Sequence, residues 1–96
     1  MRELYVQVKA REDLKKIWFY SYKEHGEKQA DKYYDGLIVG METIQDNPNI
    51  GVACDYIRIG CRQYQVDKHF IFYRLSRKKT HIIRVLHENM IAKGRI

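Results

Sequence analysis

The second half of the chain holds three strand-like segments separated by very short links. The segments are RQYQV (62–66), HFIFYRL (69–75) and HIIRVLH (81–87), rich in the β-branched and aromatic residues typical of strands. Asp67-Lys68 joins the first two, and SRKKT joins the last two. Links this short cannot carry a chain across to a parallel neighbour, so they predict an antiparallel meander. Whatever the rest of the chain does, it must pack against this sheet.

The first half of the chain is predicted to form one strand and two helices. Leu4–Ala10 alternates apolar and polar residues, which predicts a strand with one buried face. The next stretch, REDLKKIWFYSYKEHG, has apolar residues at helical spacing, with Glu12 and Asp13 in the first turn and Gly26 as the stop. A second helix follows and ends before Pro48. Its apolar stripe comprises Ala30, Tyr33, Leu37, Met41 and Ile44.

These elements predict a single α+β domain over residues 1–96 with the order β-α-α-β-β-β. The short link at Gly26 makes the helices an antiparallel hairpin, which packs on one face of an antiparallel sheet and leaves the other face open. Cys54–Gly60 is a candidate for a short strand before the meander. Gly36 and Gly40 have two readings, a groove for another helix or tight packing within this protein.

Arg62, Arg74 and Arg84 lie inside predicted strands, where a charge is unfavourable unless its face meets water or a partner. We expect these arginines on, or at the rim of, the open sheet face. The alternative is that they pair with carboxylates of neighbouring segments. The candidate carboxylates are Asp55, Asp67 and Glu88. The net charge of +6 and the pI near 9.4 fit an acidic partner, but such a charge also serves solubility alone.

The sequence also disfavours several classes of function. No apolar run opens the chain, so neither a signal peptide nor a membrane span is expected. Cys54 and Cys61 are spaced unlike a redox motif or a zinc site, and the histidines are scattered. We therefore expect free thiols, no metal, no cofactor and no covalent nucleophile, with both cysteines dispensable.

A known family resembles this chain over about residues 3 to 90. The resemblance is carried by the ordered pieces EDLKKIWFY, HGEKQADKYYDGL, NPNIG, IRIGCRQYQVDKHFIFYRL and IIRVLHENM. Their joint order, with G-x-R-x-Y-x-V, I-F-Y-R and R-V-L-H, resembles the ParE branch of the ParE/RelE superfamily. These proteins are the toxins of bacterial type II toxin–antitoxin modules.

The resemblance implies a cytoplasmic toxin that is made with a ParD-like antitoxin and is inert while bound to it. ParE-like members resemble inhibitors of DNA gyrase that trap the enzyme with cleaved DNA, whereas RelE-like members resemble ribosome-dependent mRNA endonucleases. The nuclease branch commonly continues after the last strand with basic residues and a late tyrosine. Here Glu88 and Asn89 follow, and no tyrosine comes after Tyr73. We therefore expect a gyrase inhibitor without catalytic activity; the alternative is a RelE-like mRNA endonuclease.

The expected target-binding residues are Arg62, His87 and Met90, with the tail Glu88–Ile96 contributing. The nuclease alternative would use His87 as its acid–base group together with Arg62 and Arg84. A meander is expected to hold Arg62 and His87 at opposite ends of the sheet, which disfavours a catalytic site built from both. His87 also has a structural reading, in which it caps a core face and bonds to the backbone.

The antitoxin is expected to lay a helix on apolar surface of the helical hairpin and an extended segment along a sheet edge. The hairpin has more aromatic side chains than two helices on one sheet can bury. They are Trp18, Phe19, Tyr20, Tyr22, Tyr33 and Tyr34. We assign antitoxin binding to Trp18, Tyr20 and Tyr34. The second expected partner, besides the antitoxin, is gyrase with its bound DNA. The toxin is not expected to bind nucleic acid on its own.

Overall fold

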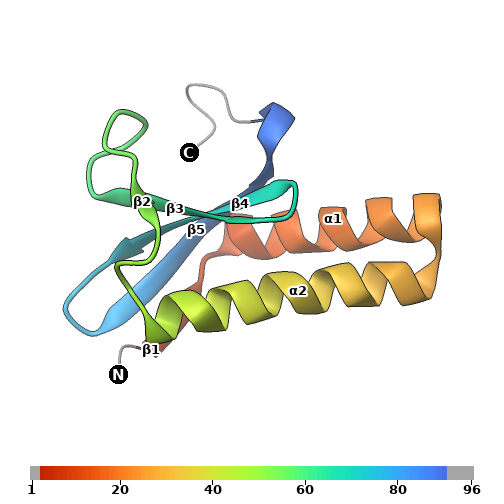
Figure 1. The fold of residues 1–96 in the computed structure, drawn as a ribbon, viewed down its shortest axis with the longest axis horizontal. Coiled ribbons are helices and arrows are strands. Elements are labelled where there is room, and N and C mark those ends of the chain that lie inside the picture. The colour runs from red at the N-terminus through yellow and green to blue at the C-terminus, as the bar shows by residue number, and fades with distance from the viewer. Residues whose placement is uncertain (1–2, 91–96) are drawn as a thin grey trace.

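The computed structural model describes residues 3–90, and these form two helices packed on a five-stranded sheet (Figure 1). The elements are β1 (Glu3–Val6), α1 (Val8–His25), α2 (Glu27–Asp46), β2 (Val52–Ala53), β3 (Cys61–Val66), β4 (His69–Leu75), β5 (Lys79–His87) and a short 3-10 helix, η1 (Glu88–Met90). The predicted α+β class and the helical hairpin are confirmed. In Figure 1 the two helices lie side by side along one face of the sheet.

The strand order is β1-β5-β4-β3-β2, and the predicted meander of β3, β4 and β5 is antiparallel throughout. The prediction of a wholly antiparallel sheet is wrong at one edge, because β1 pairs with β5 in parallel. The helical hairpin carries the chain from β1 at one edge of the sheet to β2 at the other edge. The following strands then lead back across the sheet, which brings β5 beside β1. The result is a mixed sheet with the first and last strands adjacent.

One predicted strand ends earlier than expected, and another segment is not a strand. The strand expected over Leu4–Ala10 ends at Val6, and α1 starts at Val8. Ala10 is buried as part of the apolar stripe of this helix and not as part of a strand. The segment Cys54–Gly60 is a turn rather than a strand. There the carbonyl oxygen of Cys54 accepts the N–H groups of residues 57 and 58, so the chain turns back on itself, and only the N–H of Cys54 bonds to β3, at Cys61 O.

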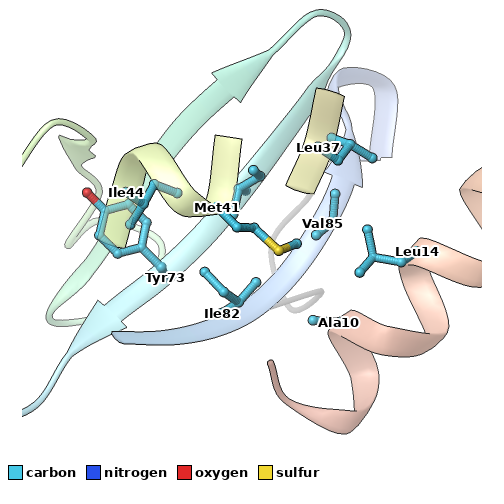
Figure 2. Packing of buried hydrophobic residues seen from close by; sticks show 9 residues of the cluster. Ala10, Leu14, Leu37, Met41, Ile44, Tyr73, Ile82 and Val85 are labelled. Carbon is cyan, nitrogen blue, oxygen red and sulfur yellow. The ribbon is translucent and has the colours of Figure 1, made fainter. Parts of the chain in front are cut away.

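The main core lies between the helical hairpin and the sheet. Figure 2 shows its side chains pointing toward one another from α1, α2, β4 and β5. The buried members are Ala10, Leu14, Leu37, Met41, Ile44, Ile71, Tyr73, Ile82 and Val85. Tyr73 also places a hydroxyl in this layer, which donates to Pro48 O at 2.7 Å and accepts from Gly51 N at 2.9 Å. The ring thus ties the loop after α2 to the middle of the sheet.

The opposite face of the sheet carries a second, smaller core, so the expectation that this face is open is wrong in part. Cys54, Cys61, Phe72 and Leu86 are buried there together, with Ile57 and Phe70 packed against them. Both cysteines are free, as expected. Burial raises the pKa of the Cys61 thiol to about 12, which keeps it protonated and a poor nucleophile.

The two helix glycines have different surroundings. A Cβ built on Gly40 would lie 2.6 Å from Val66 Cγ2 and 3.1 Å from Ile71 Cδ1, both on the sheet. A Cβ built on Gly36 would meet nothing within 4 Å. Of the two readings of these glycines, tight packing within this protein therefore holds at Gly40. At Gly36 there is open space.

This contrast predicts opposite effects of one substitution at the two glycines. Gly40→Ala should lower the free energy of unfolding by about 1–3 kcal/mol, because the added methyl overpacks α2 against β3 and β4. Gly36→Ala should raise it by up to about 1 kcal/mol through helix propensity. Urea unfolding of both variants measures the difference. Equal effects at the two positions would mean that α2 does not approach the sheet as closely as described.

Candidate functional site

Arg84 is engaged in joining α1 to β5. Its Nε donates to Asp13 Oδ2 at 2.8 Å, and its Nη2 donates to Asp13 Oδ1 at 2.9 Å. Asp13 is 7% exposed, and its Oδ2 also accepts the backbone N–H of Val85 at 3.0 Å. Strand β1 pairs with β5 only as far as Ile82, so this carboxylate takes up the edge of β5 beyond the end of β1. We call this three-residue contact the Asp13 clasp.

The structure corrects the expected partner of Arg84 and part of its expected face. Its partner is Asp13 of α1, not a carboxylate near the sheet (Asp55, Asp67 or Glu88). Simple alternation along HIIRVLH would put Arg84 on one face with Ile82 and Leu86. Arg84 does share the face of Leu86, since the two pair with Phe72 and Phe70, but a β-bulge between β4 and β5 puts Ile82, which pairs with Tyr73, on the other face.

Arg62 lies on the face of the sheet that the helices cover, so its predicted place on the open face is wrong. It pairs with Tyr73 across β3 and β4, and paired residues of antiparallel strands project to the same side. Its Nη1 donates to Gly51 O at 2.7 Å and to Asn49 O at 3.4 Å. Arg62 therefore holds the loop between α2 and β2.

Arg74 is the one member of this trio that stands exposed on the open face. It pairs with Cys61 on β3 and with His81 on β5. Its Cγ and Cδ pass beside Gly60, where a Cβ would sit 3.5 Å from Arg74 Cδ. The three arginines of the sheet thus have three different surroundings and do not converge.

His87 and Arg62 lie at opposite ends of the sheet, as the meander predicts. His87 pairs with His69, which pairs with Val66 at the end of β3. Arg62 is level with Ile82, the residue that faces Tyr73 from β5. The distance along β5 from Ile82 to His87 is about 16 Å at the usual strand rise.

A histidine pair with a tyrosine occupies the His87 end of the sheet. The rings of His69 and His87 meet edge to face with centroids 5.2 Å apart. The hydroxyl of Tyr33 on α2 hydrogen-bonds to His69 Nδ1. His87 Nδ1 accepts the backbone N–H of Asn89 at 3.0 Å, which agrees with the structural reading of His87. Burial, and then the neighbouring His87, lower the pKa of His69 to about 4, so His69 is neutral at physiological pH.

An aromatic face with lysines lies on the outer side of α1. Phe19, Tyr20 and Tyr22 are exposed, Tyr20 at 68%, and Lys23 Nζ lies 5.2 Å from the centre of the Phe19 ring. A shallow open hollow of ≈ 450 Å³ runs between these side chains. Its lining residues are Lys15, Lys16, Phe19, Tyr20 and Lys23. We call these five residues and Tyr22 the α1 aromatic face.

The other two residues assigned to antitoxin binding contribute to packing. Trp18 is half-buried, donates from Nε1 to Asp31 Oδ1 at 2.8 Å, and stacks on Tyr22, so it joins α1 to α2. Tyr34 is half-buried against the main core. Tyr20 therefore offers the most accessible ring of the three assigned residues.

The last described residue, Met90, is 42% exposed in η1. The backbone N–H of Glu88 donates to Lys68 O at 3.0 Å, which fixes the start of η1 beside the turn between β3 and β4. The rest of the predicted contributing tail, residues 91–96, lies outside the described residues.

Within residues 3–90, no group of three or more His, Cys, Asp or Glu side chains is placed to hold a metal ion. None of the helices in that same part of the chain is long and apolar enough to cross a membrane.

Two of these contacts were missed from the sequence. Asp13 falls on the buried stripe of α1, three residues after Ala10 and one before Leu14, and a carboxylate at such a position signals a buried partner. Tyr33 was predicted as core, and its polar contact with His69 had no signal in the sequence.

His69 makes stability depend on pH. An unfolded histidine with a pKa of 6.5 takes up a proton as the pH falls, whereas the folded ring with a pKa of about 4 does not. His87 adds to the lowering, and Asp67 and Asp13 oppose it. The free energy of unfolding should fall by about 1–2 kcal/mol from pH 7 to pH 5 and further toward pH 4.

The measurement is urea unfolding at several pH values. His69→Gln should flatten the profile, and the matched control His25→Gln, at an exposed position on α1, should keep it. A His69→Gln variant with the wild-type profile would assign the pH dependence to other groups.

The comparisons with known proteins agree with this fold. The family model described as "ParE toxin of type II toxin-antitoxin system, parDE" matches residues 4–92. The proteins named Toxin ParE1 from Mycobacterium tuberculosis (strain H37Rv) and Caulobacter vibrioides are similar. The first is 38% identical over 82 residues, 84% of each chain, and the second is 35% identical over 88 residues, 92% of this chain and 91% of the relative.

Solved structures show the same architecture. A chain from the "Chromosomal ParDE TA system from P. aeruginosa" superposes with a TM-score of 0.81 at 21% identity, over 91% of this chain and 96% of that chain. A YafQ mutant from E. coli superposes with a TM-score of 0.51 at 18% identity, over 93% of this chain and 96% of that chain. These two likenesses concern the fold. Through the family model and the ParE1 relatives, the chain belongs to the ParE toxin family of type II toxin–antitoxin systems.

Proposed function

We propose that this toxin inhibits DNA gyrase by stabilising its cleaved-DNA complex, and that a ParD-like antitoxin neutralises it in the cytoplasm. The observation that carries the proposal is the separation of the three groups a nuclease would need. Arg84 is held by Asp13, Arg62 is bonded to the loop after α2, and His87 lies at the far end of the sheet from Arg62.

RNA cleavage requires an acid–base group and several cations around one phosphate, because charge develops there in the transition state. Within residues 3–90, neither Arg62 nor Arg84 is placed to act with His87 on one phosphate. The ring of His87 meets the neutral His69, and His87 Nδ1 accepts a backbone N–H. The nearest sheet arginine in sequence, Arg84, is bonded to a buried carboxylate. Binding to a protein–DNA complex needs no convergence, since spread contacts suffice.

The deciding experiment compares two targets with the same purified toxin. With gyrase and plasmid DNA, the toxin should cause breaks that require gyrase. With translating ribosomes, mRNA should stay intact. His87→Gln should keep at least about a fifth of the gyrase activity, because binding contacts at one exposed residue are worth only about 0–1 kcal/mol. Cleaved mRNA without gyrase-dependent breaks would move the chain to the nuclease alternative, with His87 as its acid–base group.

The α1 aromatic face is the surface we propose for the antitoxin. Exposed aromatic rings beside lysines fit an amphipathic helix that is apolar on one side and acidic at its margins. An extended segment of the same antitoxin would then add to a sheet edge. Phe19, Tyr20 and Tyr22 are exposed in the described chain, so an antitoxin helix can reach them without any change in the toxin's fold.

Truncating Tyr20 tests this surface. Tyr20→Ala should weaken antitoxin binding about 10- to 100-fold, as expected for an interface anchor worth about 1–3 kcal/mol. The matched control is Tyr56→Ala, since Tyr56 is 79% exposed in the loop between β2 and β3. Titration calorimetry with the cognate antitoxin measures both. Equal affinities of wild type and Tyr20→Ala would remove Tyr20 from the interface.

A further inference from the structure

The stretch between Asp67 and Glu88 contains no acidic residue. Its lysines and arginines are Lys68, Arg74, Arg77, Lys78, Lys79 and Arg84. Arg84 is neutralised by Asp13, but Arg74, Arg77, Lys78 and Lys79 are exposed at the hairpin that joins β4 to β5. The fold therefore gathers positive charge at one end of the sheet.

A row of polar and aromatic side chains extends from this basic hairpin across the open face. Arg74 on β4 pairs with His81 on β5, and His81 pairs with Tyr5 on β1. The rings of Tyr5 and His81 meet edge to face with centroids 5.9 Å apart, and Lys79 Nζ lies 5.4 Å from the centre of the Tyr5 ring. The surface comprises Tyr5, Arg74, Arg77, Lys78, Lys79 and His81, and we call it the hairpin surface.

No carboxylate of the described chain neutralises the hairpin surface. Glu3 pairs with Lys79 in the strand register but forms no ion pair with it, and Asp55 accepts the backbone N–H of Gly60. In residues 3–90, Arg74, Arg77 and Lys78 likewise have no carboxylate oxygen within 4.0 Å. The charge is thus left for a partner.

We propose that the hairpin surface contacts the phosphate backbone of the duplex DNA held by the toxin's target topoisomerase. This inference rests on the proposed function and assigns it a second contact, separate from the α1 aromatic face. Phosphates are bound by arginine and lysine, with hydrogen bonds from side chains such as tyrosine, and these residue types are present. An acidic protein partner would favour a buried apolar anchor among the charges, and Tyr5, the one large ring here, lies under Lys79.

The two faces are physically independent. The helices cover one side of the sheet in Figure 1, and Tyr5, Arg74 and His81 project from the other. A loss of DNA contact can therefore be separated from a loss of antitoxin binding.

The test uses gyrase, plasmid DNA and full-length toxin from 50 to 200 mM KCl. The variant is Arg77→Gln with Lys78→Gln, and the control is Lys28→Gln with Lys32→Gln, which removes the same charge from exposed sites on α2. Each lost phosphate contact should make the plot of log affinity against log salt concentration less steep by about 0.9. The variant should therefore need about tenfold more toxin than wild type at 50 mM KCl to give the same number of breaks. This difference should shrink as the KCl concentration rises. The control should follow wild type.

Antitoxin affinity and the urea midpoint establish that both variants are folded. A hairpin variant with wild-type potency and salt slope would overturn the inference. So would a loss of potency that is the same at every salt concentration, which would indicate a protein contact. A wild-type toxin that yields no gyrase-dependent breaks would refute the proposed function and the DNA contact together. Loss in the variant of ribosomal mRNA cleavage alone would assign the surface to RNA.

Discussion

The Asp13 clasp is the contact on which the arrangement of the two layers depends. Strand β1 is too short to cover β5, and the backbone N–H of Val85 would otherwise face the side of α1 unbonded. Asp13 satisfies that donor and the Arg84 guanidinium at once, which is the condition under which a buried charge is tolerated. It sets α1 against the end of β5.

With the clasp in place, the arginines of the sheet have separate tasks. Arg84 joins a helix to a strand, Arg62 holds the loop after α2, and Arg74 is free to meet a partner on the opposite face. A chain of this size has few side chains to distribute, and two of its three sheet arginines are used to position elements. A toxin that acts by binding can use the surfaces that remain, whereas a nuclease would need these groups at one phosphate.

The sequence predicted what depends on neighbouring residues and missed what depends on distant ones. Short links determined the meander, and helical spacing identified the stripe from Ala30 to Ile44. Alternation along RQYQV places Arg62 on one face with Tyr64 and Val66, yet which side of the sheet the helices would cover was not encoded locally. The bulge at Ile83 reset the alternation around Arg84. Asp13 and Arg84 are 71 positions apart, so their pairing had no local signal.

We infer that Arg84 acts through folding and not through chemistry. A double-mutant cycle with Asp13→Ala and Arg84→Met tests it most directly, with unfolding free energy and gyrase-dependent toxicity measured for each variant. Each single change is expected to be destabilising, with a coupling of about 1–3 kcal/mol between them, and activity should follow the folded fraction. An Arg84→Met variant that is as stable as wild type but has lost activity would contradict it.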